Sequence, residues 1–149
     1  MTARELMTAL IGAENMNTDT VDTCKWGDPD RELRKVGTCL TPTPDVLRAA
    51  GEWGADLLIT HEPCVYDHLD QPRKDPVTEK KLELLRACGY TIWRLHDYIH
   101  NRKGPDGIHA GFIEKLGLKG TYDEHRVFIP ETPLTAFELA KKAETAGWT

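Results

Sequence analysis

Apolar residues recur along the chain in short blocks whose spacing alternates between that of a helix and that of a strand. The first block opens with Thr2 and Glu5, a capping-box pair that predicts the start of a helix. The helix-spaced apolar positions that follow are Leu6, Leu10, Ile11 and Ala13. The polar stretch at 15–34, rich in Asp, Thr, Gly and Pro, predicts a loop with a short strand near its middle.

A regular alternation of strand and helix begins at Val36. Apolar runs predict strands at Val36–Leu40, Leu57–Ile59, Tyr90–Leu95 and His125–Ile129. Helices are predicted after Thr43-Pro44-Asp45, from Asp75-Pro76 to Cys88, over Ile108–Leu116 and after Thr132-Pro133. Strands and helices that alternate in this way form right-handed βαβ units. We therefore expect a single α/β domain over residues 1–149, with a largely parallel or mixed sheet, helices on both faces and repeated β-α units.

Composition and charge narrow the class of protein. The 149 residues include 19 basic and 24 acidic ones, and the net charge of −5 argues against a nucleic-acid or anionic-membrane surface. No apolar run approaches the roughly 20 residues that span a bilayer, and acidic residues interrupt the N-terminal apolar stretch, so neither a membrane span nor a secretory signal is expected. Four scattered cysteines suit a reducing cytoplasm, which is the expected location. The sequence has no serine, which excludes a Ser–His–Asp mechanism.

Histidines and carboxylates gather directly after two of the predicted strands. His61 and Glu62 come just after the apolar run Leu57–Ile59, and the segment His96–His100 follows the strand Tyr90–Leu95. In an open parallel sheet, ligands bind in the crevice beyond the carboxyl ends of the strands. We therefore expect the two clusters to converge at one edge of the sheet.

Imidazole nitrogens and carboxylate oxygens are ligands that proteins use for Zn²⁺, Fe²⁺ and Mn²⁺. The predicted cofactor is a divalent ion of this kind, with one or two ions at the site. The expected metal ligands are His61, Glu62, Asp97 and His100. His96 is a candidate catalytic residue, because an imidazole can carry a proton near neutral pH. His68, flanked by acidic residues, lies in the loop after the first cluster.

Simpler interpretations of these residues stay open. A His–Glu pair in a loop is commonly a solvated surface pair. The pair His61-Glu62 does not extend to the metalloprotease HExxH pattern, because Val65 occupies the position of the second histidine. His109 and His125 lie away from both clusters and are expected to be structural or surface residues.

The segment Gly54–Pro63, GADLLITHEP, resembles a signature of the NGG-one-interacting-factor-three-like family. Members of that family are also described as GTP cyclohydrolase I type 2 homologues or dinuclear-metal-centre hexameric proteins. The stretch Thr41–Leu47 is similar to the family sequence before the signature, and His96–His100 lies where the family has an HxxxD element. The resemblance implies a cytoplasmic α/β protein that assembles as a toroidal homohexamer around pairs of metal ions, with metal-dependent hydrolysis as its usual activity.

Carried over by position, the resemblance implies that His61 is the first histidine ligand, that Glu62 replaces the second, and that His100 replaces an aspartate ligand. Further residues fit a subgroup with Glu at the second position: Tyr66, His68, Asp70 and Asp97. The family's remaining ligands, a His and a Glu near its C-terminus, have no counterpart here. We therefore expect the chain to correspond to the N-terminal portion of a longer architecture.

Three functional hypotheses follow from these observations. The first is a metal-dependent hydrolase that acts on a nucleotide or phosphoester-like small molecule and forms a homo-oligomer. The second is a metal-binding protein without turnover, which serves as an oligomeric scaffold or binds a partner. The third is a purely structural domain whose histidines are surface residues.

Overall fold

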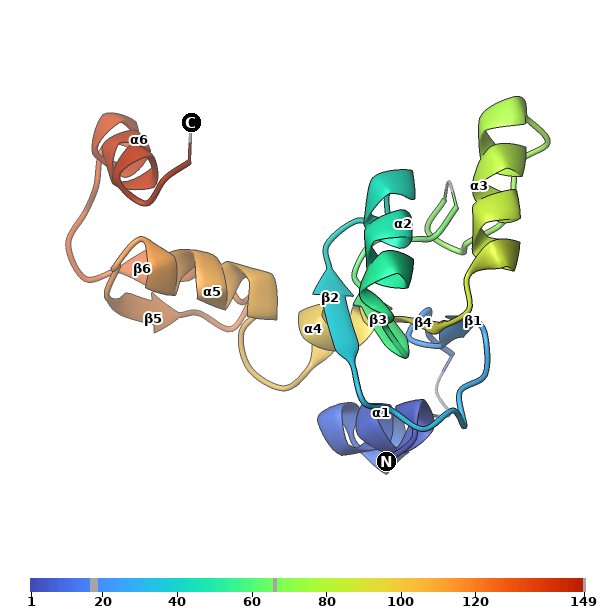
Figure 1. Cartoon of the computed structure of the whole chain (residues 1–149). Coiled ribbons are helices and arrows are strands. Elements are labelled where there is room, and N and C mark those ends of the chain that lie inside the picture. The colour runs from blue at the N-terminus through green and yellow to red at the C-terminus, as the bar shows by residue number, and fades with distance from the viewer. Residues whose placement is uncertain (17–18, 66, 149) are drawn as a thin grey trace. The chain divides into compact units, whose positions relative to one another are not determined.

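The computed structural model describes residues 1–16, 19–65 and 67–148, and its chain divides into two compact units, Met1–Tyr98 and Ile99–Thr149 (Figure 1). Tyr66, which the family resemblance singled out, lies outside the described residues. The single-domain expectation is not decided by this division, and each unit is described by itself.

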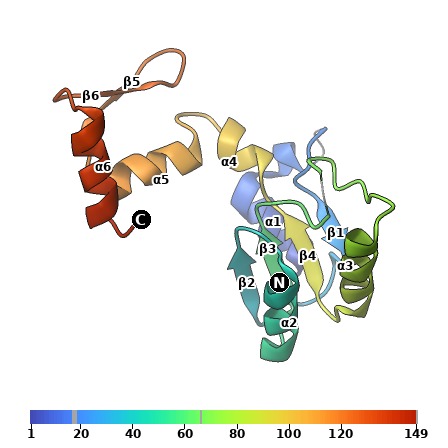
Figure 2. The same ribbon diagram turned by 90° about the horizontal axis from the view of Figure 1, so that it is seen from above.

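The first unit is built on one mixed sheet of four strands in the order β1-β4-β3-β2, which can be followed in Figure 2. The strands are β1 (Cys24–Trp26), β2 (Val36–Cys39), β3 (Leu57–Thr60) and β4 (Thr91–Arg94). The pairs β2–β3 and β3–β4 are parallel, whereas β1 runs antiparallel to β4 at the edge. The predicted α/β fold with a mixed sheet is confirmed.

Helices cover both faces of this sheet, because each face is apolar. On one face, Leu58 and Ile92 pack with residues of α2 (Pro44–Trp53) and α3 (Pro76–Ala87). On the other face, Leu57 and Trp93 pack with Ala3 and Met7 of α1 (Ala3–Ile11). Figure 1 shows α1 on one side of the strands and α2 and α3 on the other. Alternate residues of the central strands therefore serve two separate cores, as a continuous apolar run requires.

The helix starts in this unit follow the capping chemistry that the sequence predicts. The hydroxyl of Thr43 accepts a hydrogen bond from the Val46 amide, and the Asp75 carboxylate accepts from the amides of Val77 and Thr78. The capping box of Thr2 and Glu5 is present in α1. The buried stripe of α1 differs from the prediction, since Ala3, Met7 and Ile11 are buried and Leu10 is 48% exposed.

The second unit contains two helices and a hairpin. Helix α5 (Gly107–Lys115) is followed by β5 (Gly120–Tyr122) and β6 (Phe128–Pro130), which pair antiparallel in their own two-stranded sheet, and then by α6 (Ala136–Thr145). The β6 strand overlaps the predicted one, but its partner β5 was not predicted. The prediction that the last helix starts after Thr132-Pro133 is wrong. Helix α6 starts three residues later, where Thr135 and Glu138 form a reciprocal capping box.

Two further helices are short. The 3₁₀-helix η1 (Ala13–Asn15) follows α1, and α4 (Asp97–Asn101) follows β4. The boundary between the two compact units falls inside α4. Among the described residues, no helix has the length and apolar character needed to cross a membrane.

Candidate metal centre

The parallel register of β3 and β4 brings the two histidine segments to the same edge of the sheet. Thr60 pairs with Arg94, so the residues that follow each of them leave the sheet side by side. The rings of His61 and His96 stack with their centroids 4.5 Å apart. The two segments therefore converge at the carboxyl ends of adjacent strands.

A buried carboxylate from a distant part of the chain holds the second segment. Asp22 is 2% exposed, and its oxygens accept hydrogen bonds from the backbone amides of His96, Asp97 and Tyr98 at 2.6, 2.9 and 2.7 Å. The first of these amides directly precedes α4 and the other two begin it, and the N–H groups at a helix start have no acceptors within the helix. Asp22 therefore fixes the direction in which α4 leaves the sheet.

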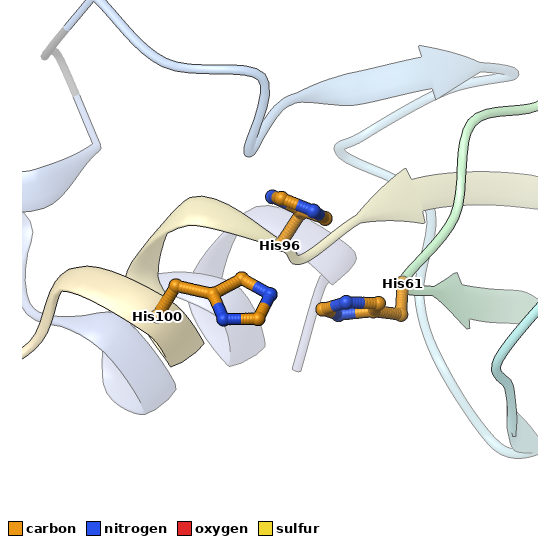
Figure 3. Close-up of side chains that lie close together, drawn as sticks. All are labelled: His61, His96 and His100. Atoms are coloured by element: carbon orange, nitrogen blue, oxygen red, sulfur yellow. The ribbon is translucent and has the colours of Figure 1, made fainter. Parts of the chain in front are cut away.

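His61, His96 and His100 come together as shown in Figure 3, each offering a ring nitrogen within 4.8 Å of the others. His96 directly precedes α4 and His100 lies on it one turn later, so both rings project from the same helical face. His61 comes from the loop after β3. Three imidazoles at this spacing are able to hold one divalent ion.

The hydrogen bonds of the three rings define which nitrogen of each carries the proton. The Nδ1 atoms of His61, His96 and His100 lie 3.2 Å from the Leu95 carbonyl oxygen, 2.9 Å from Asp97 Oδ1 and 2.6 Å from Asp106 Oδ2. Carbonyl and carboxylate oxygens can only accept, so each Nδ1 is the donor, and in the neutral form of each ring Nε2 holds the lone pair. Metal-binding histidines in proteins are oriented in this same way.

The two carboxylates that orient these rings stay ionised at neutral pH. Burial raises the pKa of Asp97, but hydrogen bonds from His96, Thr20 and the Val21 amide outweigh it and lower the pKa to about 2. Burial likewise raises the pKa of Asp106, and hydrogen bonds from His100 and from the first amides of α5 lower it to about 2. Both aspartates are therefore acceptors for an imidazole N–H.

A second group of potential ligands consists of His68, His96 and Asp97, whose donor atoms also lie within 4.8 Å of one another. His68 Nε2 is 3.8 Å from Asp97 Oδ1, and the His68 ring meets the His96 ring edge to face with centroids 5.0 Å apart. The site thus brings together four of the six histidines of the chain.

Comparison with known proteins identifies the family of this chain. A sequence profile of the family Duf34/NIF3 (NGG1p interacting factor 3) matches residues 16–146. The chain belongs to the Duf34/NIF3 family. The family resemblance noted in the sequence is therefore confirmed.

Curated relatives in this family are longer than the chain. A GTP cyclohydrolase 1 type 2 homolog of Halalkalibacterium halodurans is 27% identical over 113 residues, which make up 76% of this chain and 29% of the relative. A homolog of the same name from Methanocaldococcus jannaschii is 24% identical over 116 residues, or 64% of this chain and 44% of the relative. The chain spans less than half the length of either relative.

Solved structures of other proteins share the fold. Protein ybgI matches with a TM-score of 0.74 and 17% identity over 98% of this chain and 60% of that one. Reduced HcgD from Methanocaldococcus jannaschii matches with a TM-score of 0.67 and 21% identity over 97% of this chain and 60% of that one. At these identities the likeness shows the α/β fold alone.

The structure places the predicted site residues unequally in this Duf34/NIF3 chain. His61, His96 and His100 form one group, and Asp97 contacts His96. Glu62 is absent from both groups found among the described residues, and it lines a cavity of about 480 Å³ with Thr41, Pro63, Val65, Val77, Thr78 and Lys81. His109 and His125 are exposed, as expected of surface residues.

The sequence did not predict the residues that fix the position of the site histidines through hydrogen bonds. Asp22 and Asp106 lie in loops whose local sequence gives no sign of contact with a histidine. Asp106 offered one signal, because an Asp directly before a predicted helix is a capping residue, and it does cap α5. A buried arginine, Arg94, gave no signal within its apolar strand.

Proposed function

We propose that this Duf34/NIF3 chain binds a divalent metal ion through His61, His96 and His100. The observation that carries the proposal is that an acceptor faces Nδ1 of each ring, at Leu95, Asp97 and Asp106. With Nδ1 of each ring facing an acceptor, Nε2 is the nitrogen that would bind the ion, which is the usual orientation of metal-binding histidines. His96, expected from the sequence as a proton carrier, is better suited to be a ligand.

The donor set narrows the choice of metal. Imidazole ligands suit Zn²⁺ and Fe²⁺, whereas Mn²⁺ prefers carboxylate and carbonyl oxygens. We therefore place Zn²⁺ and Fe²⁺ ahead of Mn²⁺ for the group His61, His96 and His100. Asp97 orients the ring of His96 through its carboxylate. Glu62 lies outside this group, and we assign it to a second ion or to the substrate.

We further propose that the site hydrolyses a nucleotide or phosphoester-like small molecule. A divalent ion with three protein ligands lowers the pKa of a bound water and polarises an electrophilic oxygen. The chain's own residues keep that site rigid: Asp22 fixes the start of α4, and Asp97 and Asp106 hold the rings of His96 and His100. The fold in turn fixes His61 through the backbone of Leu95.

The metal proposal is tested by elemental analysis of the purified chain together with His61→Ala. We expect close to one zinc or iron ion per chain in the wild type, and loss of most of that metal in the variant. His109→Ala is the matched control, because His109 is an exposed histidine outside both groups. A wild-type chain that takes up no metal from zinc- or iron-containing buffer would contradict the proposal.

A second candidate is metal binding without turnover. It is favoured by the donor set, since His61, His96 and His100 account for metal binding and the sequence offers no serine nucleophile for turnover. Hydrolysis of GTP and of p-nitrophenyl phosphate, measured before and after chelation, separates the two. Metal-dependent turnover supports the hydrolase, and metal uptake without turnover supports the scaffold.

The remaining expectations belong to the same proposal. We propose that residues 1–149 act as one metal-binding domain, that the chain forms a homo-oligomer, hexameric by family resemblance, and that it works in the cytoplasm. Light scattering of the metal-loaded chain tests the oligomer. A monomer at micromolar concentration would contradict it.

A further inference from the structure

The loop that carries His68 is fastened by a buried ionic network. Asp70 Oδ1 accepts a hydrogen bond from the Cys64 amide at 2.6 Å, which closes the loop on itself. Asp70 Oδ2 lies 3.2 Å from Arg94 Nη1 and 3.2 Å from Lys25 Nζ. The side chains of Asp70, Arg94 and Lys25 are 10%, 1% and 14% exposed, so the network is shielded from solvent and holds the loop in place.

Arg94 connects this loop to the candidate metal centre. It extends from β4, and its Nε donates to the backbone carbonyl of His61 at 3.1 Å. Its Nη1 donates to the backbone carbonyl of His68. The rigid fork of one guanidinium therefore fixes the backbone of His61, which precedes the Cys64–Asp70 loop, and of His68, which lies within it.

The same guanidinium faces the ring of His68. Arg94 Nη2 lies 3.4 Å from His68 Nδ1. A guanidinium can donate hydrogen bonds but cannot accept them, so the nitrogen that faces it is the one with the lone pair. In neutral His68 the proton is therefore on Nε2, which is the opposite assignment to that of His61, His96 and His100.

The Nε2–H group of His68 lies beside His96 and Asp97, with which His68 forms the second group of potential metal ligands. His68 Nε2 lies 3.8 Å from Asp97 Oδ1, which is longer than a hydrogen bond. The His68 side chain is 56% exposed, so a small molecule can reach it. His68 therefore places an N–H donor next to His96, the residue that belongs to both groups of potential metal ligands.

We propose that His68 is a hydrogen-bond donor for an oxyanion bound at the metal, and that Arg94 is the positioning residue that holds its ring in the required tautomer. The ligand class is a phosphate or carboxylate oxygen, because such an oxygen satisfies a cation and an N–H donor together. The proposal rests on the proposed metal site. It assigns His68 to substrate binding and not to the set of residues that bind the metal.

The tautomer is tested without any metal. Nitrogen-15 NMR of the metal-free wild type, at about pH 8 where an ordinary imidazole with a pKa of roughly 6.5 is neutral, reports which ring nitrogen is protonated. We expect the Nε2–H form for His68 and the Nδ1–H form for His61, His96 and His100. An Nδ1–H form at His68 would overturn the assignment to Arg94.

The role in binding is tested with zinc and inorganic phosphate as probes. In His68→Ala we expect unchanged zinc content and roughly tenfold weaker phosphate binding to the zinc-loaded chain, the effect of losing one hydrogen bond to a charged group. His68→Gln, which keeps an N–H donor, should recover part of the affinity. Loss of zinc to the extent seen in His61→Ala would make His68 a ligand, and unchanged phosphate affinity would remove its role.

The two proposals fail in distinguishable ways. A wild-type chain that binds no zinc overturns the metal site, and the oxyanion role of His68 with it, while the NMR experiment still decides whether Arg94 sets the tautomer. A chain that binds zinc, with unchanged phosphate affinity in His68→Ala, overturns only the inference on His68.

Discussion

Asp22 and His96 are 74 residues apart in the sequence, yet the carboxylate of one accepts a hydrogen bond from the backbone amide of the other at 2.6 Å. The same carboxylate serves the next two amides of α4. Asp22 therefore acts as the N-terminal cap of a helix from which it is far removed in the sequence. Two of the three proposed histidine ligands, His96 and His100, depend on the direction that this cap gives to α4.

The first prediction follows from this cap. Asp22→Ala leaves three amides without their acceptor, and we expect the free energy of unfolding to fall by about 2 kcal/mol. Zinc affinity should fall as well, because α4 loses its fixed start. Urea unfolding followed by circular dichroism measures the first effect. The control is Asp19→Ala, an exposed aspartate in the same loop; equal losses in the two variants would refute the capping role of Asp22.

The second prediction concerns the orientation of His100. Asp106→Asn removes the charge that faces His100 Nδ1 but keeps an oxygen that can cap α5. We expect zinc affinity to fall roughly 10- to 100-fold, as for other carboxylates that orient metal-binding histidines. Competition with a chromogenic chelator measures the dissociation constant. Asp123→Asn is the control, since Asp123 accepts only from amides of its own turn among the contacts described. Unchanged affinity in Asp106→Asn would argue against His100 as a ligand.

The third prediction concerns the buried arginine. Arg94→Met removes the partner of Asp70 and leaves the carbonyls of His61 and His68 without their donor. We expect a loss of about 3 kcal/mol in the free energy of unfolding, because one member of a buried ion pair is deleted. Arg86→Met, an exposed arginine near the end of α3, serves as the control in the same urea titration. A loss below that of the control would show that Lys25 alone satisfies Asp70.

The fourth prediction concerns acid stability. Hydrogen bonds from the backbone amides of Arg34 and Lys35, joined by one from Arg31, lower the pKa of Asp56 below its ordinary value. A lowered pKa in the folded state contributes stability above the unfolded value of about 3.9, and this contribution is lost as the pH falls through the folded pKa. We expect Asp56→Asn to flatten the fall in unfolding free energy below about pH 4.

Unfolding in urea at a series of pH values measures this slope. Asp45→Asn removes the same charge from an exposed position and is the matched control. A variant Asp56→Asn whose stability falls with acid as steeply as that of the wild type would contradict the prediction.

The fold of the first unit was predictable because its signals are local. Thr43 and Asp75 cap their own helices, and the run Leu57–Ile59 has the apolar character of a strand covered on both faces. The hairpin of β5 and β6 was less accessible, because strands of three residues carry too little pattern to be distinguished from a loop. The start of α6 was misplaced because Thr132-Pro133 has the same capping chemistry as Thr135.

The candidate site was predictable only in part, for a related physical reason. The rule that ligands bind at strand ends identifies His61 and the segment of His96, since it depends only on where strands stop. It cannot identify Asp22 or Arg94, whose contacts depend on how distant segments pack. Glu62 illustrates the opposite case, because its position beside His61 suggested a shared ligand set, yet it lies outside both groups of potential ligands and lines a separate cavity.

His61 differs from the other two proposed ligands in that its ring is oriented by a peptide carbonyl, that of Leu95, and not by a carboxylate. A substitution at position 95 keeps the backbone carbonyl in place. A shift of β3 against β4 would separate that carbonyl from His61 Nδ1. An ion held by His61 would therefore oppose such a slip, and its binding energy would add to the stability of the native strand pairing. Stripping the metal should then loosen the middle of the sheet, where hydrogen exchange at the amides of Ile59 and Trp93 would record it.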